Sequence, residues 1–387
     1  MDANAAFHKC KKRFNEALTL DAIDLFPLRA TGGVSPEMAL GNMPTRPALL
    51  VRLRTEDGCF GWGEIWANFP PRANQHKAHI VEDVIASRLL GTTFVDPDEV
   101  TSRLRASFST YFLHVGQPLV FEHILAGLDI ALWDLALRQR GESFVEFIGL
   151  STRAAPTYAS SINASDAERL IIKHSGLGQQ HFKIKVGFGS KTDLELVRKA
   201  AEFCPSDNHI MIDSNQSWGL KEARHALDQL ADLAPFFAEE PLRADANLAD
   251  WQALAKSTLI PLAGGENIYG QTRFAAFAQS GLRFLQPDVA KWGGVSGALD
   301  LAHTLPEHAN LWPHFMGTAV GQVASLCIAA AAGPDAVCEM DVNENRLRTD
   351  LCGDILQIEN GKVLLPTEPG LVVPPLDEQL EAFHDSP

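Results

Sequence analysis

The spacing of hydrophobic and polar positions divides the chain into regions with different patterns. Between about residues 20 and 145 the pattern is mixed. The stretch LLVRLRTEDGCFGWGEIW alternates apolar and polar positions, which predicts a hairpin with Asp57 and Gly58 in its turn. The later segment FEHILAGLDIALWDLALRQRGESFVEFIG has apolar residues at helical spacing on more than one face, which predicts a buried helix ending near Gly141. This region is therefore expected to form an N-terminal α+β unit.

Between about residues 154 and 344, short apolar strands alternate with amphipathic helices, as in βαβ units. Eight repeats at near-regular spacing favour a (β/α)8 barrel over a doubly wound sheet, and no GxGxxG or GxxxxGK[ST] motif is present. From about residue 345 the proline-containing tail LLPTEPGLVVPP is too irregular to be another barrel unit, so we expect it to pack on the N-terminal unit. The predicted strands are PTYASSI, HFKIKV, NHIMIDSN, PFFAEEP, LIPLAGGE, RFLQPDVA, NLWPHFM and AVCEMDV.

Composition narrows the classes of function. The chain has 33 basic and 48 acidic residues, a net charge of −15, which argues against general binding to nucleic acid or anionic membranes. Its six cysteines form no CxxC pair, so neither a disulfide framework nor a zinc site is predicted. The N-terminal stretch lacks the apolar core of a secretory signal and no later run is long enough to cross a bilayer, so we expect a cytoplasmic protein.

Polar side chains end almost every predicted barrel strand. The carboxyl ends of barrel strands form the active site of TIM barrels, so these side chains are expected to converge. Lys185 and the first three acidic strand-end residues, Asp213, Glu239 and Glu266, follow one another at steps of 28, 26 and 27 residues, one barrel repeat each. The full set is Lys183, Lys185, Asp213, Asn215, Glu239, Glu266, Asp288, His314 and Glu339.

The carboxylates of Asp213, Glu239 and Glu266 would repel one another unless a cation neutralised them. All-oxygen ligation without Cys or His suits Mg²⁺. The alternative is that each carboxylate caps a helix or meets a surface lysine. Three carboxylates at successive strand ends favour the metal site.

Two further pairs suggest acid–base chemistry. Lys183 and Lys185 are two residues apart on one strand, so both face the barrel interior if either does. Beside a cation they would lower each other's pKa, which makes one a usable base; a solvated pair is the alternative. Asp288 and His314 end neighbouring strands, where the carboxylate would fix the imidazole tautomer and raise its pKa. A histidine buried in the core is the alternative for His314.

These motifs together resemble the mandelate racemase-like subgroup of the enolase superfamily, in the mandelate racemase/muconate lactonizing enzyme family. The resemblance covers nearly the whole chain, including a helix with Asp129, Trp133 and Asp134 and the late Pro369–Leu371 motif PGL. The matching motifs are KIK, Asp213 with Asn215, EEP at 239–241, GGEN around Glu266, PDxxxxGG from Asp288, and His314.

The resemblance implies a (β/α)7β TIM-like barrel at 151–345, preceded by an extension at 1–20 and an α+β capping domain at 21–150 that the C-terminal segment 346–387 completes. It implies Mg²⁺ on Asp213, Glu239 and Glu266, with Glu240 at best near the metal site. It further implies that Lys185 is one acid/base and the His314–Asp288 dyad the other. Substrate contacts would come from Lys183, Asn215 and Glu339, and a homo-oligomer is expected.

A protein of this kind removes the proton α to a carboxylate through an enediolate, which Mg²⁺ and the lysines would stabilise. We expect a small carboxylic acid substrate and dehydration of a sugar acid to a 2-keto-3-deoxy acid. A racemase or epimerase of a 2-hydroxy acid is the alternative. A non-catalytic ligand-binding protein and a Schiff-base aldolase are less favoured. Capping-loop candidates for substrate contact are Arg29, Arg46, Asn68, Arg72 and His76.

Overall fold

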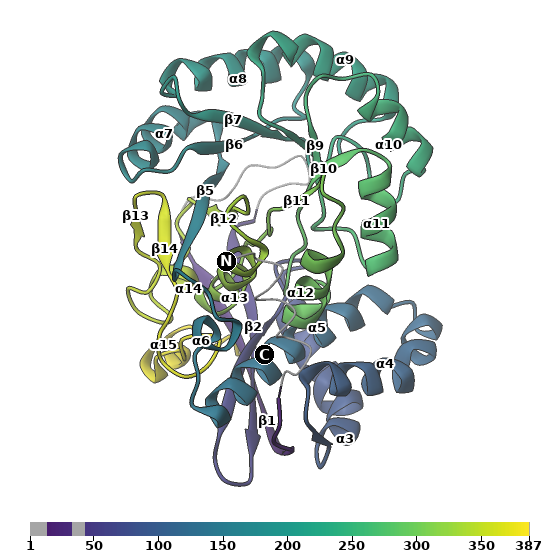
Figure 1. Cartoon of the computed structure of the whole chain (residues 1–387), viewed down its shortest axis with the longest axis vertical. Coiled ribbons are helices and arrows are strands. Elements are labelled where there is room, and N and C mark those ends of the chain that lie inside the picture. Colours follow the sequence, from purple (N-terminus) through teal and green to yellow (C-terminus); the bar gives the residue numbers. More distant parts are fainter. Residues whose placement is uncertain (1–13, 33–42, 387) are drawn as a thin grey trace.

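The structure, a computed structural model, describes residues 14–32 and 43–386. Most of the expected N-terminal extension at 1–20, and residues 33–42 of a predicted substrate loop, lie outside these ranges. In Figure 1 the β1–β4 sheet with α4 and α5 occupies the lower half, and the barrel with its surrounding helices occupies the upper half. No helix in the described ranges has the length and apolar character needed to cross a membrane.

The capping unit is a four-stranded antiparallel sheet with helices packed on it, in the strand order β3-β2-β1-β4. The predicted hairpin is confirmed: β2 and β3 pair from Leu49–Ile65 to Arg54–Phe60, and Gly58 takes the positive φ of 85° that its turn requires. The unit comprises β1 (Leu18–Thr31), β2 (Thr45–Thr55), β3 (Phe60–Ile65), β4 (Thr93–Phe94), α2 (Ala73–Ile80), a π-helical turn (Val81–Ile85), α3 (Ala86–Leu89), α4 (Pro97–His114), α5 (Pro118–Arg140) and α6 (Phe144–Ile148).

The predicted buried helix is α5, which ends at Gly141 in the left-handed conformation, as expected. It packs closely against β3 because glycines replace side chains at the contact. A Cβ on Gly63 would lie 2.1 Å from the carbonyl oxygen of Gly127, a backbone atom that cannot move aside independently. This close contact joins the sheet to the helix that also meets the barrel.

Replacement of Gly63 by alanine is expected to lower the free energy of unfolding by about 3 kcal/mol, since the added methyl overpacks the β3–α5 contact. Urea unfolding followed by circular dichroism measures this change. Gly219→Ala is the control, because Gly219 has a φ of −81° and nothing lies near its Cβ position. Equal stability of the two variants would refute the close packing at Gly63.

The barrel contains all eight predicted strands, which run parallel in the order β11-β10-β9-β8-β7-β6-β5, with β12 paired to the other side of β5. The backbone bond from Glu339 N to Pro313 O, 3.0 Å, links β12 to the segment after β11 and so closes the circle. The strands are β5 (Ala154–Ile162), β6 (His181–Lys185), β7 (His209–Asp213), β8 (Ala238–Glu239), β9 (Leu262–Gly264), β10 (Leu282–Leu285), β11 (Asn310–Leu311) and β12 (Cys338–Asp341).

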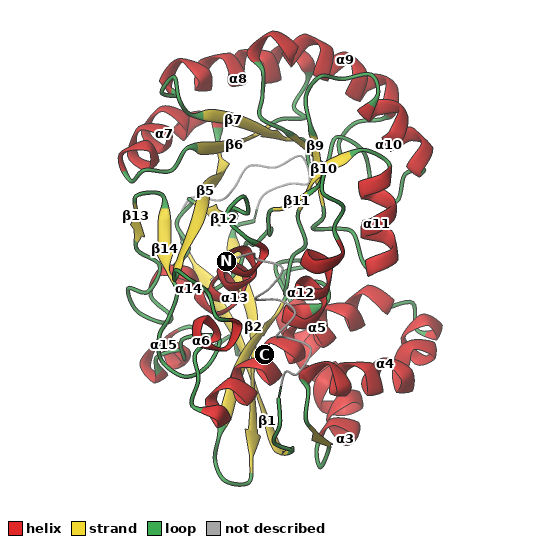
Figure 2. Ribbon diagram, in the orientation of Figure 1, coloured by secondary structure: helices red, strands yellow, loops and turns green. Residues whose placement is uncertain are grey.

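Helices surround these strands, as Figure 2 shows by colour. The last strand is followed only by the short α14 (Arg346–Thr349), which gives the (β/α)7β arrangement. The connecting helices are α7 (Ala167–Gly176), α8 (Ser190–Phe203), α9 (Leu220–Leu230), α10 (Leu248–Ala255), α11 (Gln271–Gln279), α12 (Gly294–Thr304) and α13 (Ala319–Ala332), with 3-10 turns at Ala164–Asp166 and Ala231–Leu233.

The C-terminal tail packs on the capping unit, as predicted. The backbone nitrogens of Leu371 and Val372 donate to Asp134 Oδ1 at 2.7 and 3.0 Å. The tail also adds an unpredicted hairpin to the barrel, because β14 pairs antiparallel with β5. The elements of the tail are β13 (Ile358–Glu359), β14 (Lys362–Leu364) and α15 (Asp377–Ala382).

Aromatic rings fill the N-terminal end of the barrel around His181, whose ring centroid lies 4.7 Å from that of Phe236. Burial, and to a smaller extent the charge of His209, lowers the pKa of His181 to about 4. A histidine in the unfolded chain has a pKa of about 6.5, so the unfolded state binds more protons between these values. The stabilising contribution is therefore complete above about pH 6.5 and is lost as the pH falls toward 4.

We expect His181→Phe to reduce the loss of unfolding free energy between about pH 7 and pH 5 by about 1–2 kcal/mol, because the variant has no imidazole to protonate. Urea titrations of wild type and variant at both pH values measure the difference. An unchanged pH dependence would contradict the assignment of a neutral, half-buried His181.

Candidate active site

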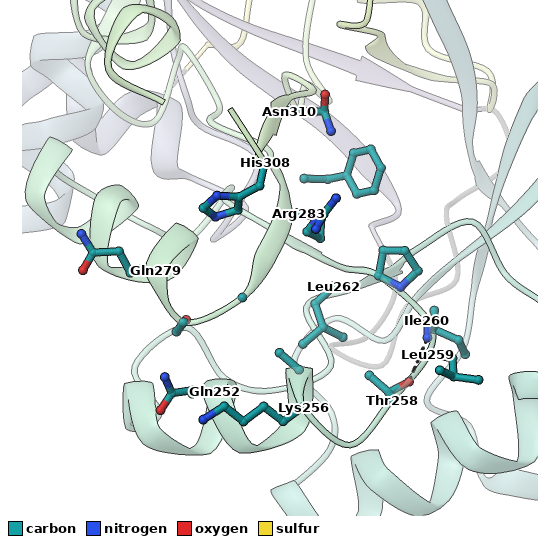
Figure 3. Close-up of a pocket in the computed structure, with 15 residues that line it drawn as sticks. Gln252, Lys256, Thr258, Leu259, Ile260, Leu262, Gln279, Arg283, His308 and Asn310 are labelled. Carbon is teal, nitrogen blue, oxygen red and sulfur yellow. Dashed lines mark hydrogen bonds between the residues drawn. The ribbon is translucent and has the colours of Figure 1, made fainter. Parts of the chain in front are cut away.

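The hollow drawn in Figure 3 has a volume of about 490 Å³. It lies at the end of the barrel opposite to the predicted active site. Its lining comes from segments that lead into β9, β10 and β11, including Ile260, Gly281 and His308. These are the amino ends of the strands. The predicted site residues lie at the opposite, carboxyl ends, where TIM-barrel active sites form.

At the carboxyl ends, the predicted residues stand side by side. Lys185 is the register partner of Asp213 across β6 and β7, and Asp213 is the partner of Glu239 across β7 and β8. Glu266 follows β9 by two residues. The convergence inferred from the spacing of 26–28 residues is therefore present in the fold.

Both predicted lysines are buried and paired with carboxylates. Lys183 Nζ lies 2.6 Å from Glu239 Oε2 and 2.8 Å from Glu339 Oε1. Lys185 Nζ lies 2.5 Å from Asp213 Oδ2. Burial lowers the pKa of Lys183, but the charges of Glu239 and Glu339 outweigh it and hold the pKa well above its usual value.

The predicted lowering of one lysine's pKa by the other is present but is outweighed by the carboxylates when no cation is bound. Lys183 does lower the pKa of Lys185, as does burial, but the charge of Asp213 outweighs both and the net shift is upward. Carboxylates at hydrogen-bond distance act more strongly than the neighbouring ammonium.

The predicted His314–Asp288 dyad is present. His314 Nδ1 lies 2.9 Å from Asp288 Oδ2, and the two residues form a parallel β-bridge. His314 Nε2 faces the other side of the barrel mouth, 3.3 Å from Glu266 Oε2 and 3.6 Å from Glu339 Oε2. Burial lowers the pKa of His314, but Glu339, Glu266 and the bond to Asp288 raise it to about 10. The imidazolium is therefore the favoured form, with a proton available at Nε2.

The residues present fit a divalent cation by charge and by donor type. Six carboxylates surround the barrel mouth against four cationic side chains, so negative charge is in excess. Burial raises the pKa of Glu239 to about 8, and the charges of Asp213 and Glu339 add to this against the opposing effect of Lys183. The carboxylates belong to Asp213, Glu239, Glu240, Glu266, Asp288 and Glu339, and the cations to Lys183, Lys185, Lys291 and His314.

No three His, Cys, Asp or Glu side chains in the described ranges are already gathered as a metal site, because the cations occupy the carboxylates. Asn215 lies beside Asp213 and its buried Oδ1 accepts no hydrogen bond within these ranges. Hard oxygen donors of this kind are the ligands that Mg²⁺ prefers. Asp213, Glu239 and Glu266 thus remain the proposed Mg²⁺ ligands.

Glu239 and Glu240 face different partners. Glu240 has a positive φ of 43°, and its Oε1 accepts from Asn267 Nδ2 at 2.9 Å. Glu239 instead faces Lys183 and accepts from Gln286 Nε2 at 2.6 Å. The environment of Glu239 is thus continuous with that of Asp213, which the sequence alone could not establish.

Sequence reasoning missed Gln286 and Lys291. Gln286 precedes Asp288 by two residues, so the same alternation that paired Lys183 with Lys185 could have found it. Lys291 lies in the loop after β10; its Nζ is 3.5 Å from Glu266 Oε2 and 2.8 Å from Asn267 Oδ1. No periodic signal marks this loop lysine.

A polar cluster from the capping unit meets the barrel beside Lys291. Lys77 Nζ bonds to the Trp66 carbonyl and lies 2.9 Å from His123 Nδ1, and His123 Nε2 lies 3.0 Å from the Tyr269 hydroxyl. Burial, with a contribution from Lys291, lowers the pKa of Lys77 to about 7. No sequence pattern marks any member of this cluster, because its residues come from four separate segments.

The five capping-loop residues predicted as possible substrate contacts have different surroundings in the structure. Arg29 pairs with Asp385 at 2.7 Å and buried Arg46 pairs with Asp341 at 3.2 Å, so both hold the structure together. Asn68 Nδ2 donates to Met316 O at 2.5 Å, next to the segment that carries His314. His76 and Arg72 are exposed. None of the five contacts the predicted catalytic residues in the described structure.

Comparison with known proteins gives two family matches. Residues 165–379 match the family described as "Enolase C-terminal domain-like". Residues 29–149 match "Mandelate racemase / muconate lactonizing enzyme, N-terminal domain". The first match covers the barrel from α7 onward, and the second covers most of the capping unit.

Among curated relatives, a D-galactarolactone cycloisomerase from Agrobacterium fabrum is 29% identical over 87% of this chain and 90% of its own. An arabinonate dehydratase from Saccharolobus solfataricus is 26% identical over 86% of this chain and 90% of its own. A solved mandelate racemase/muconate lactonizing enzyme from Bordetella bronchiseptica is 35% identical with a TM-score of 0.86, covering 95% of this chain and 99% of its own. A solved structure of an enolase from Bradyrhizobium, complexed with magnesium and mandelic acid, is 25% identical with a TM-score of 0.83, covering 96% of this chain and 99% of its own.

Proposed function

Since the chain belongs to the mandelate racemase/muconate lactonizing enzyme family of the enolase superfamily, we propose that it dehydrates a sugar acid to a 2-keto-3-deoxy acid. The observation that carries this proposal is the placement of Lys185 and His314. They come from β6 and from the segment after β11, separated in the barrel by β5 and β12, and both reach the same group of carboxylates. A base and an acid on different walls of one mouth suit removal of a proton and loss of a hydroxyl from one substrate.

In the proposed reaction, Lys185 Nζ takes the proton α to the substrate carboxylate as a neutral amine. Asp213 would favour the ammonium form of Lys185 less strongly when it holds Mg²⁺, so the neutral form becomes accessible. Lys183, held between Glu239 and Glu339, donates to that carboxylate. Mg²⁺, when held by Asp213, Glu239 and Glu266, supplies positive charge that stabilises the enediolate form of the substrate.

His314 then protonates the departing β-hydroxyl from Nε2, and the resulting enol tautomerises to the keto acid. Asp288 holds Nδ1 and so keeps Nε2 directed to the mouth. The surrounding carboxylates favour the imidazolium form, which is the form a leaving hydroxyl requires. Racemisation is the alternative, in which His314 would act as a neutral base in one direction.

The test is a screen of sugar acids and their lactones with Mg²⁺ for 2-keto acid formation, alongside α-proton exchange into D₂O. Keto acid formation would support dehydration. Exchange with inversion and no keto acid would point to racemisation or epimerisation, and consumption of a lactone alone would point to the cycloisomerisation named for the Agrobacterium relative. No reaction and no exchange across the panel would refute the proposal and favour a ligand-binding role.

A further inference from the structure

A cleft of about 510 Å³ opens beside the proposed catalytic residues. Asn215 and Asn267, which adjoin Asp213 and Glu266 in the sequence, line the cleft together with Tyr269. Two arginines, Arg243 and Arg273, also line it. Its volume is within the range of about 300–1,000 Å³ that is usual for small-molecule sites. The cleft is therefore large enough for the far end of a small substrate, and it borders the proposed catalytic residues through Asn215 and Asn267.

The hydrogen bonds behind Tyr269 fix the direction of its hydroxyl. An anion bound in the cleft would favour the charged form of Lys77, because opposite charge stabilises an ammonium. In that form Lys77 has only donors, so it donates to the Trp66 carbonyl and to His123 Nδ1. Burial keeps the pKa of His123 well below its usual value, so the ring is neutral and its one proton lies on Nε2. His123 then donates to the Tyr269 oxygen, which leaves the Tyr269 hydrogen free to donate to a ligand.

Two buried cations lie behind this hydroxyl: Lys291, whose charge acts on Tyr269 directly, and Lys77, which is connected to it through His123. Lys77 is 2% exposed, and no ion pair found within residues 14–32 and 43–386 joins it to a carboxylate. The ammonium groups of Lys77 and Lys291 each lie 4.8 Å from the Trp66 ring centroid.

The carboxylates nearest Tyr269 already have partners. Glu122 pairs with Arg105, Asp288 with His314, and Glu266 with both His314 and Lys291. Asp245, which also lines the cleft, pairs with Arg243 at 2.7 Å. The part of the cleft at Tyr269 therefore offers a hydroxyl donor with cations behind it, which matches an anionic acceptor.

We propose that Tyr269, supported by Lys77 and Lys291, binds the second carboxylate of a dicarboxylic sugar acid. The substrates would then be aldaric acids or their lactones rather than aldonic acids, whose far end is a hydroxymethyl group. This inference rests on the proposed function, in which the reacting carboxylate lies at Lys183. The second carboxylate is the group left to occupy the cleft.

The experiment compares paired acids of the same configuration, such as galactarate and galactonate, which differ only at C6. Wild type, Tyr269→Phe and the control Tyr111→Phe are measured for binding by calorimetry and for kcat and KM, all with Mg²⁺. Tyr111 is 46% exposed on α4, so its change should affect neither acid. We expect wild type to prefer the diacid at least tenfold, and Tyr269→Phe to lose about tenfold in kcat/KM for the diacid alone, mainly through KM.

Lys77→Met is the second variant, because it removes the donor that orients His123. It should weaken diacid binding in the same direction, with an unchanged circular dichroism spectrum as the check on folding. Diacid binding that is unaffected by Tyr269→Phe would overturn the subsite while leaving dehydration intact.

The two proposals fail in different ways. Diacid binding that depends on Tyr269 but yields no product would support the subsite and refute dehydration. Turnover of aldonic acids with no preference for diacids would support dehydration and overturn the subsite. Absence of any diacid binding would also overturn it.

Discussion

Replacement of Lys185 by alanine is expected to reduce kcat by at least about 10³-fold and to abolish α-proton exchange with D₂O, because no other group on β6 replaces its Nζ as the base. The His314→Asn variant should lose dehydration by a similar factor yet retain exchange, since Lys185 still removes the proton. Mass spectrometry of recovered substrate in D₂O and a keto acid assay separate the two steps.

These two variants test separately the proposed base, Lys185, and the proposed acid, His314. Lys256→Ala is the control, because Lys256 is an exposed lysine in the hollow at the opposite end of the barrel. Loss of exchange in His314→Asn and its retention in Lys185→Ala would reverse the assigned roles. Full activity of both variants would exclude them from the chemistry.

Replacement of Glu239 by glutamine is expected to lower Mg²⁺-dependent activity by about 10³-fold or more. It should also abolish the stabilisation that Mg²⁺ gives the wild type. A cation held at 100 times its Kd stabilises a folded protein by about 2.7 kcal/mol, so magnesium should raise the Tm of wild type measurably and EDTA should reverse the effect. Without Mg²⁺, the variant should remain folded because Lys183 keeps Glu339 as a partner.

Glu240→Gln is the matched control for this change. Glu240 is equally buried but bonds to Asn267 rather than to Lys183, so we expect this variant to keep most of the Mg²⁺-induced shift in Tm. The opposite result, a shift kept in Glu239→Gln and lost in Glu240→Gln, would transfer the ligand role to Glu240. No shift in wild type at millimolar Mg²⁺ would contradict the metal site.

The barrel and its catalytic end were predictable because the relevant information is local and periodic. Apolar strands of a few residues at regular spacing indicate the barrel, and a polar residue at the end of each strand is carried to the same rim whatever the details of packing. Lys185, Asp213 and Glu239 are register partners for this reason. The His314–Asp288 dyad follows from the same rule, applied to neighbouring strands.

The net charge state of the site was not predictable in the same way. The rise in the pKa of Lys183 depends on Glu339 from β12 and Glu239 from β8, at distances that only the closed barrel sets. The hairpin that β14 forms beside β5 was also missed, because its short strands carry no clear alternation.

By itself, the sequence determined the strand–helix repeat, the buried helix ending at Gly141 and the polar residues that gather at the carboxyl ends of the barrel strands, because each is a pattern within one segment or one repeat. Only the tertiary structure decided which of Glu239 and Glu240 faces Lys183, and how Lys77, His123 and Tyr269 connect across the seam between capping unit and barrel. Contacts of this second kind depend on how whole elements pack, since residues far apart in the chain acquire their direction, partners and charge only when those elements meet.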